Sequence, residues 1–280
     1  MTVSLAAASA SQIDWHLLFN RIFNGSPVFW GALLATVYIS VCAEVLGIIL
    51  GIITMGASRS RVLPVRWLAW LYRLVMRGTP PIVQIFFIYY GANLLLGFDL
   101  FPTNLTIGSL TISGAIIAGI VALGLNEGAF MSEIIRGGVD AIEAGQLEAA
   151  LSVGMTRRQA MRKIIAPQAA RVIIPTIGNQ YNYMLKATSL LSFIGVYEMF
   201  QDAQVGYSAT FQPVEYFLGV AIWYLVLTSV WGVIQSRIEK KLGASDYENI
   251  GDRRLWKPWK SNGKPVLVEH QTQELERSGV

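Results

Sequence analysis

Charged side chains are scarce in this 280-residue sequence: Asp, Glu, Lys and Arg make up 14%, against roughly 25% in ordinary soluble proteins. Seven of the 18 acidic and nine of the 22 basic residues lie after Ser236, so the first 236 residues hold only 11 and 13. Residues of the set AVILMFWYC make up 53%, and the mean hydropathy is +0.47. Too few charges remain to cover a soluble surface, and so apolar a chain is not a disordered one. The composition therefore predicts a membrane protein.

Cysteine pairs and a phosphate-binding loop are also missing. Cys42 is the one cysteine, which excludes a disulfide framework and a cysteine-ligated metal site. The one Gly-Lys pair, Gly263-Lys264, is followed by Pro265 instead of Ser or Thr and has no glycine five positions earlier. We therefore expect no ATP site, no catalytic residues, no metal and no cofactor on this chain.

Five apolar segments are long enough to cross a bilayer, which takes about 20 residues of helix. They are Pro27–Met55, Pro80–Phe98, Ser109–Asn126, Val172–Tyr197 and Tyr216–Ser236. The predicted fold class is all-α, an integral membrane helical bundle with about five transmembrane helices. The chain divides into an extracytoplasmic segment 1–26, a transmembrane domain 27–236, and a cytoplasmic tail 237–280 that is expected to be partly disordered.

Basic residues fall in only two of the connections between these spans. Five arginines lie between the first two spans and six Lys or Arg residues between the third and fourth, whereas connections 97–108 and 198–215 hold acidic residues and no basic one. Cytoplasmic loops carry the excess of Lys and Arg. We therefore expect a multi-pass protein of the bacterial inner membrane, with its N-terminus outside and its C-terminus in the cytoplasm.

Residues 64–77 are predicted to form a separate helix in the cytoplasmic interface. Arg66, Arg73 and Arg77 are spaced by seven and four, so they share one face, which would turn toward lipid headgroups. Thr79 is expected to cap the next helix, with Pro80 at its first position. The alternative is one long tilted helix.

The cytoplasmic loop 136–170 carries a helix–turn–helix pattern. Residues 143–153 favour a helix that Gly154 ends. Thr156 with Gln159 forms a capping-box signature for a second helix, which is expected to end at Pro167. Small alanines with an acidic residue beside them suit docking to a soluble partner, and a structural lid is the alternative.

The same loop resembles a known family. Glu148-Ala149-Ala150, with Gly154 four residues after the last alanine and Pro167 beyond it, is similar to the EAA loop of ATP-binding-cassette importer permeases. The wider text EIIRGGVDAIEAGQLEAALSVGMTRRQAMRKIIAPQAARVIIPTIGNQ resembles the branch that imports polar amino acids and opines. So do the text RGTP at 77–80 with VQIFFIYYG after it, and the text LKATSLLSFIGVYE. Together these matches cover roughly residues 27–245.

The resemblance implies a type I importer permease that transports amino acids and is not itself an enzyme. Glu148, Ala149, Ala150 and Gly154 would belong to a coupling helix seated in an ATPase subunit. The implied partners are an ATPase dimer that holds ATP and Mg²⁺, a second permease that is identical or homologous, an extracytoplasmic solute-binding protein and membrane lipid, with no nucleic acid. The family often has an aspartate where this chain has Ala187, and usually a leucine at Ala166, so the carried amino acid or opine stays open.

Four polar residues of the fourth span recur every three or four positions: Asn179, Asn182, Lys186 and Ser189. This spacing confines them to about 80° of the helix surface, and such a stripe should face the bundle or a pore. We predict a translocation pathway, in which Lys186 attracts a substrate carboxylate while Glu44 and Glu127 neutralise it or meet a cationic group. The alternative is that Lys186 pairs with Glu44 or Glu127 only to hold helices together.

An ion-gradient-driven secondary transporter of amino acids is the rival function. Such a protein would place paired carboxylates or unwound helices at mid-membrane, often within inverted repeats. The sequence shows neither clearly. A membrane scaffold or enzyme subunit would leave the polar stripe unexplained.

Overall fold

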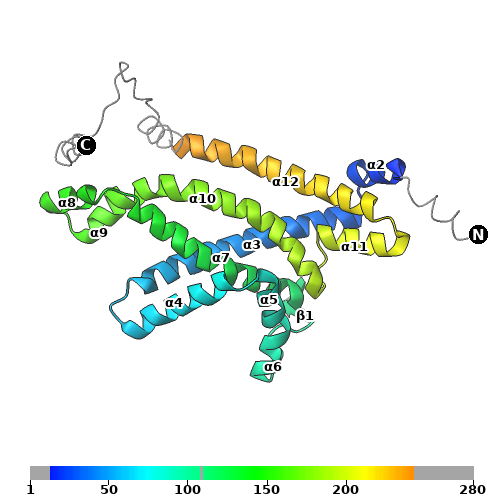
Figure 1. The fold of residues 1–280 in the computed structure, drawn as a ribbon, viewed down its shortest axis with the longest axis horizontal. Coiled ribbons are helices and arrows are strands. Elements are labelled where there is room, and N and C mark those ends of the chain that lie inside the picture. Colours follow the sequence, from blue (N-terminus) through cyan, green and yellow to red (C-terminus); the bar gives the residue numbers. More distant parts are fainter. Residues whose placement is uncertain (1–12, 108–109, 243–280) are drawn as a thin grey trace, which may run out of the picture. The chain divides into compact units, whose positions relative to one another are not determined.

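The computed structural model describes residues 13–107 and 110–242, and Figure 1 shows their arrangement. Within these ranges the regular structure is helical apart from one two-stranded hairpin. The elements are α2 (Trp15–Phe23), α3 (Pro27–Ser58), α4 (Leu63–Gly78), α5 (Pro81–Phe86), the π-helical η1 (Phe87–Gly91), α6 (Ala92–Leu96), β1 (Asn104–Ile107), β2 (Leu110–Ser113), α7 (Gly114–Asp140), α8 (Ala144–Ser152), α9 (Arg157–Ala160), the π-helical η2 (Met161–Ile165), α10 (Ala166–Ala187), the 3₁₀-helical η3 (Thr188–Ile194), α11 (Met199–Thr210) and α12 (Pro213–Leu242). The tail beyond Leu242 lies outside the described residues.

Three of the described helices are long and apolar enough to cross a membrane: α3, α7 and α12. The segment Pro81–Gly91 is apolar but shorter, and α10 is not among the three because the polar stripe lowers its hydropathy. The predicted all-α membrane fold class is confirmed.

The third expected span begins later and ends later than predicted. Leu110–Ser113 is strand β2, which pairs antiparallel with β1 so that Asn104 lies opposite Ser113. Helix α7 starts only at Gly114 and continues to Asp140, well beyond the expected end at Asn126. The β-branched residues of the text LTIS fit a strand as well as an apolar helix, so hydrophobicity alone did not separate the two.

The core of the bundle is the long contact between α3 and α7, with α10 packed against both and α12 packed along α10 (Figure 1). Ala43, Gly47 and Gly51 recur every fourth residue and are buried. A Cβ atom added at Gly51 would lie 2.4 Å from the Cβ of Met131, and one added at Gly47 would lie 2.7 Å from the Cβ of Glu127. Small residues at this spacing allow two membrane helices to approach closely. The α3–α7 contact therefore depends on these glycines.

Helix α4 is separate from α5, as the residue pattern predicts, but the break has a different chemistry. Pro80 takes the N-cap position and Pro81 the first turn, so the expectation that Thr79 caps the helix is wrong. The Thr79 hydroxyl donates to the carbonyl of Val75 and accepts from the Gln84 amide. Pro80 therefore occupies the cap position of α5, and the Thr79 side chain instead bonds to a carbonyl in the last turn of α4.

The helix–turn–helix in the loop is confirmed, and its predicted end is wrong. Thr156 and Gln159 form a capping box at the start of α9. The second helix does not end at Pro167, because α9 continues through the π-helical turn η2 into α10. The Ala166 N–H bonds to the Met161 carbonyl five residues back. The wider π turn changes the hydrogen-bond register just before the proline, which lacks an N–H of its own.

Candidate functional site

Helix α8 presents a small exposed surface at one end of α7. Glu148 and Ala149 are exposed, whereas Ala150 is 3% exposed and faces the rest of the loop. Two large apolar side chains next to them, Leu151 and Val153, are 44% and 78% exposed. An acidic residue beside uncovered apolar side chains at a helix end is a surface that another protein could cover.

Gly154 sets the direction in which the chain leaves α8. Its φ of +85° lies in the left-handed region. The Gly154 N–H bonds to the Leu151 carbonyl at 3.0 Å and the Met155 N–H to the Ala150 carbonyl at 3.1 Å, the two bonds of a Schellman motif. Ala150, Ala160 and Ile165 are all buried, so α8 packs back onto α9 and η2. η2 in turn continues directly into α10.

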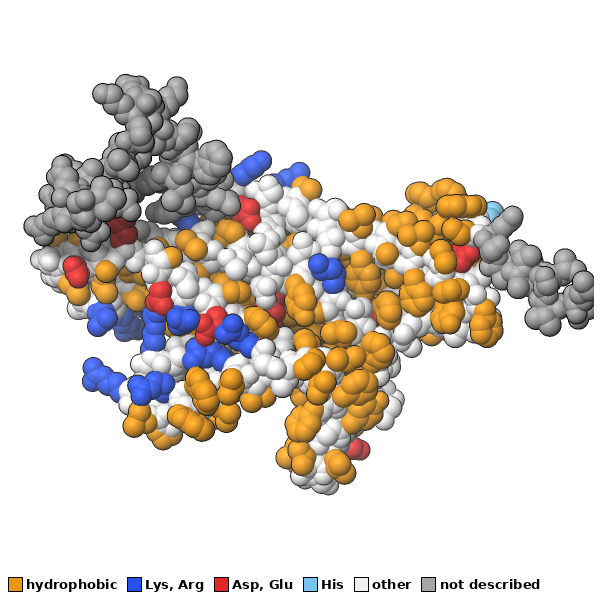
Figure 2. Space-filling view, in the orientation of Figure 1, with side chains coloured by type: hydrophobic (Ala, Val, Ile, Leu, Met, Phe, Trp, Pro, Cys, Tyr) orange, Lys and Arg blue, Asp and Glu red, His pale blue; other side chains and the backbone are white. Residues whose placement is uncertain are grey.

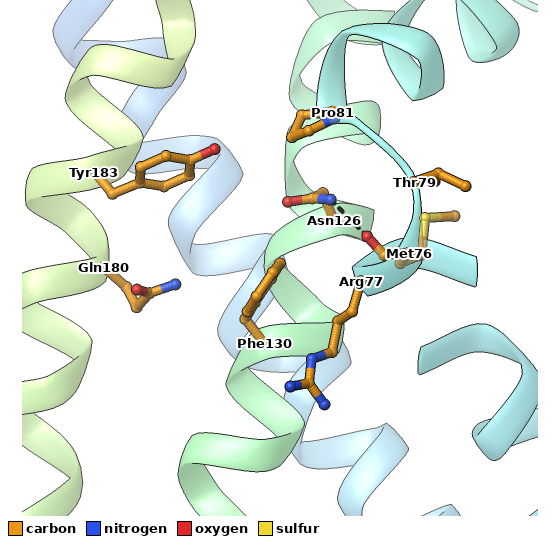
Figure 3. A pocket seen from close by; sticks show the side chains of 8 residues that line it. All are labelled: Met76, Arg77, Thr79, Pro81, Asn126, Phe130, Gln180 and Tyr183. Carbon is orange, nitrogen blue, oxygen red and sulfur yellow. Dashed lines mark hydrogen bonds between the residues drawn. The ribbon is translucent and has the colours of Figure 1, made fainter. Parts of the chain in front are cut away.

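A cavity of about 330 Å³ lies between α7, α10 and the break between α4 and α5. Figure 3 shows its lining: Met76, Arg77, Thr79, Pro81, Asn126, Phe130, Gln180 and Tyr183. The Asn126 amide donates to the Met76 carbonyl at 2.9 Å and to Gln84 Oε1 at 3.0 Å, which fixes the break against α7. The Arg77 guanidinium lies over the Phe130 ring, 5.6 Å from its centroid. The cavity therefore combines a cation, amides and a phenol from three segments.

Two acidic side chains are buried beside this cavity. Glu127 is fully buried, and its Oε1 accepts a 3.0 Å hydrogen bond from the Gln180 amide, which also lines the cavity. Glu44 is 5% exposed, and neither of its carboxyl oxygens has a hydrogen-bond partner among the described residues; nor has Glu127 Oε2. Tyr72 packs nearby and donates to the Leu125 carbonyl at 2.6 Å. Burial, with the Glu127 charge, raises the pKa of Tyr72 to about 12, so its hydroxyl stays a donor at neutral pH.

The polar stripe does not lie on one helix or in one environment, because α10 ends at Ala187 and Ser189 belongs to the 3₁₀ helix η3. Asn179 is exposed and accepts from the Gln235 amide of α12 at 3.2 Å, while Asn182 is half-buried and its Oδ1 has no partner in the described chain. Ser189 donates to the Lys186 carbonyl. Lys186 is exposed, and in the described ranges no ion pair joins it to Glu44 or Glu127. The structure therefore does not support the alternative in which Lys186 pairs with Glu44 or Glu127 to hold the helices together.

Several cavity residues were not identified from the sequence. Gln180 follows Asn179, the first residue of the predicted stripe. The spacing of three and four residues that defines the stripe does not include it. Arg77 was assigned to headgroups, whereas its guanidinium lies 3.9 Å from Glu133 of α7. Glu133 also pairs with Arg136, three residues further along α7. The consecutive prolines Pro80 and Pro81 favour a break between two helices at this point. The sequence does not show that the break packs against α7.

Helices long enough to cross a membrane, a cavity between helices of the bundle and an exposed helix on a loop are together what a membrane transport protein with a soluble partner requires. Residues 45–244 match the family described as the inner membrane component of binding-protein-dependent transport systems. The match covers most of the chain, and the chain belongs to this family.

Individual relatives agree with this assignment. The chain is 36% identical over 232 residues to the probable amino-acid permease protein YxeN of Bacillus subtilis, covering 83% of this chain and 97% of that protein. It is 36% identical over 226 residues to the arginine transport system permease protein ArgU of Corynebacterium glutamicum, covering 80% and 71%. The nopaline transport system permease protein NocQ of Agrobacterium fabrum is 34% identical over 211 residues, covering 74% and 86%.

Solved structures show the same fold. A crystal structure of an amino acid ABC transporter with histidines matches with a TM-score of 0.68 at 33% identity, covering 77% of this chain and 94% of that chain. An inward-facing structure of the MetNI methionine ABC transporter matches with a TM-score of 0.61 at 14% identity, covering 77% and 96%, and supports the fold alone.

Proposed function

We propose that this permease subunit forms the translocation pathway of an ATP-driven amino-acid importer and is coupled through Glu148–Gly154 to a separate ATPase. Transport of amino acids or opines is supported by the names of relatives that are 34–36% identical over most of the chain, which are amino-acid, arginine and nopaline permeases. Coupling is supported by one observation above all, the exposed α8 surface held by the Gly154 turn.

The proposed mechanism follows from how α8 is attached. An ATPase pair that closes on ATP with Mg²⁺ would draw together the α8 helices of two permeases, identical or homologous. Each α8 packs on α9 and η2, which continue into α10, and α10 carries Asn179, Asn182 and Lys186 of the polar stripe and two cavity residues. Two packings of the bundle would then differ in stability with the state of the ATPase, as a two-state switch requires. A solute-binding protein would deliver the substrate at the face that holds the N-terminus, and the basic loops would face the cytoplasm.

Reconstitution of the permease with its ATPase and solute-binding protein in vesicles tests this proposal. Uptake of a labelled amino acid should require ATP and should persist when an ionophore collapses the ion gradients. A secondary transporter gives the opposite pattern, with uptake that survives without ATP and stops with the gradient. That result would overturn the proposal.

Lys186 offers a test of the pathway itself. Lys186→Met is expected to lower the rate of uptake at least about fivefold while leaving the melting temperature unchanged, since an exposed lysine without an ion pair adds little stability. Lys240→Met, an equally exposed lysine in the last turn of α12, is the matched control and should transport normally. Unchanged uptake by the Lys186 variant would remove this residue from the pathway.

A further inference from the structure

A second cavity lies between α4 and the end of α3 and shares no lining residue with the cavity described above. It has a volume of about 440 Å³ and is lined by Ser58, Arg66, Trp67, Trp70 and Arg73. In Figure 2, blue Lys and Arg side chains gather near the α3–α4 connection, with orange apolar side chains next to them. Nothing in the proposed transport cycle uses these residues.

The position of the cavity places it at the membrane surface. Ser58 is the last residue of α3, which is long and apolar enough to be a membrane span, so the cavity opens where the span ends. Trp67 and Trp70 are 65% and 46% exposed, and their ring centroids lie 5.4 Å apart. Tryptophan side chains are enriched at headgroup level because their rings are apolar with one polar end.

Charge around this cavity is unbalanced. Six arginines lie on α4, in the α3–α4 connection and near the end of α7, and they meet two carboxylates: Arg59, Arg61, Arg66, Arg73, Arg77 and Arg136 against Glu133 and Asp140. Four positive charges therefore remain in excess. Arg73 is bound to Glu133 at 2.7 Å and Arg59 to Asp140 at 2.7 Å.

Arg66 differs from Arg73, the other arginine that lines the cavity. The Arg66 side chain is exposed and forms no ion pair or hydrogen bond among the described residues, and only its backbone N–H is engaged, with the Val62 carbonyl at 3.2 Å. The Ser58 hydroxyl already donates to the Thr54 carbonyl at 2.8 Å and Arg73 is paired with Glu133, which leaves Arg66 as the charged donor of the lining that is available to an anion. Sequence spacing assigned three arginines to the headgroups, and the structure leaves one of them, Arg66, free for that role.

We propose that this cavity binds one anionic phospholipid, with the headgroup phosphate on Arg66 and the acyl chains along Trp67, Trp70 and Leu74. A guanidinium matches a phosphate in geometry and charge, and anionic lipids are concentrated in the cytoplasmic leaflet. Leu74 is 53% exposed and continues the apolar surface of the two tryptophans along α4. A soluble anion such as free phosphate would satisfy Arg66 but would leave these apolar side chains in water, whereas a lipid covers both.

Native mass spectrometry of the purified permease assembly, titrated with phosphatidylglycerol or phosphatidylcholine, tests this site. One arginine at the membrane surface changes anionic-lipid affinity by about fivefold. Arg66→Ala is therefore expected to lose about that factor for phosphatidylglycerol and to keep its affinity for phosphatidylcholine, while Arg66→Lys retains most of the binding. Arg237→Ala, an exposed arginine near the end of α12, controls for the loss of charge.

A fluorescence measurement distinguishes a lipid from a soluble anion. Phosphatidylglycerol with brominated acyl chains should quench tryptophan emission more in the wild type than in Arg66→Ala, and Trp67→Phe/Trp70→Phe should abolish that difference. Equal lipid retention by Arg66→Ala and wild type would overturn the site. So would displacement of the lipid by millimolar glycerol phosphate, which would show that a soluble phosphate suffices. Neither readout depends on transport, so failure here leaves the proposed function untouched.

Discussion

Replacing Gly154 by valine is expected to reduce ATP-driven uptake to less than about a tenth of wild type while leaving the protein inserted and folded. A β-branched residue is disfavoured at φ +85° by about 1–2 kcal/mol or more, so the turn after α8 should open. Opening the turn would break the two hydrogen bonds that hold it, from the Gly154 N–H to the Leu151 carbonyl and from the Met155 N–H to the Ala150 carbonyl. A Cβ atom at Gly154 meets no other atom within 4 Å, so the bundle itself is not disturbed. The measurement is uptake together with stimulation of the partner ATPase.

Two matched variants separate backbone geometry from side-chain size. Gly154→Asn should keep at least about half of the activity, because asparagine tolerates the left-handed region far better than valine. Gly145→Ala, in the first turn of α8 with open space at its Cβ and no positive φ, should transport like wild type. If Gly154→Val transported normally and stimulated the ATPase fully, α8 would not be the coupling element.

The local parts of the candidate site follow from the sequence because they are local. A glycine after an alanine-rich helix and a Thr-x-x-Gln cap depend on residues within four or five positions, and both form where expected. The cavity between α7 and α10 does not follow from local sequence, because its lining comes from three separate segments, around residues 76–81, 126–130 and 180–183. Nothing in the spacing of one segment determines which other segments it meets. Residues such as Gln180 and Phe130 therefore became site residues only in the folded chain.

The fold shows the same division between pattern and packing. Hydrophobic length alone predicts α3 and α12, with errors of a few residues at their ends. It misses α11, whose mixed composition resembles a loop and whose N-terminus is fixed by Glu198, which accepts from the Gln201 N–H at 2.9 Å. It also misses the hairpin before α7, where three β-branched or apolar residues, Leu110, Thr111 and Ile112, suit either structure. Segments whose class is decided by a cap or a pairing partner are thus harder to predict than long apolar helices.

The second large effect is expected at the contact between α3 and α7. Gly51→Ile should lower the yield of folded, monodisperse protein at least about tenfold, because the added Cβ would lie 2.4 Å from Met131 Cβ and 3.0 Å from the backbone of Met131 and Ser132. Backbone atoms cannot rotate away, so α3 and α7 must separate along their length. Overpacking usually costs about 1–3 kcal/mol, and displacing two helices should exceed that range. Size-exclusion profiles and thermal melting in detergent measure the effect.

A glycine on the same helix provides the control that decides whether the contact or the helix is responsible. Gly56→Ile makes the same chemical change in α3, five residues further on, where an added Cβ meets nothing within 4 Å. Both variants gain the same apolar side chain and lose the same flexible residue, so any general effect on insertion or helix propensity is shared. Only Gly51→Ile should melt earlier. If the two variants behaved alike, close approach of α3 to α7 would not be what holds the bundle together, and the mechanical continuity on which coupling depends would need another origin.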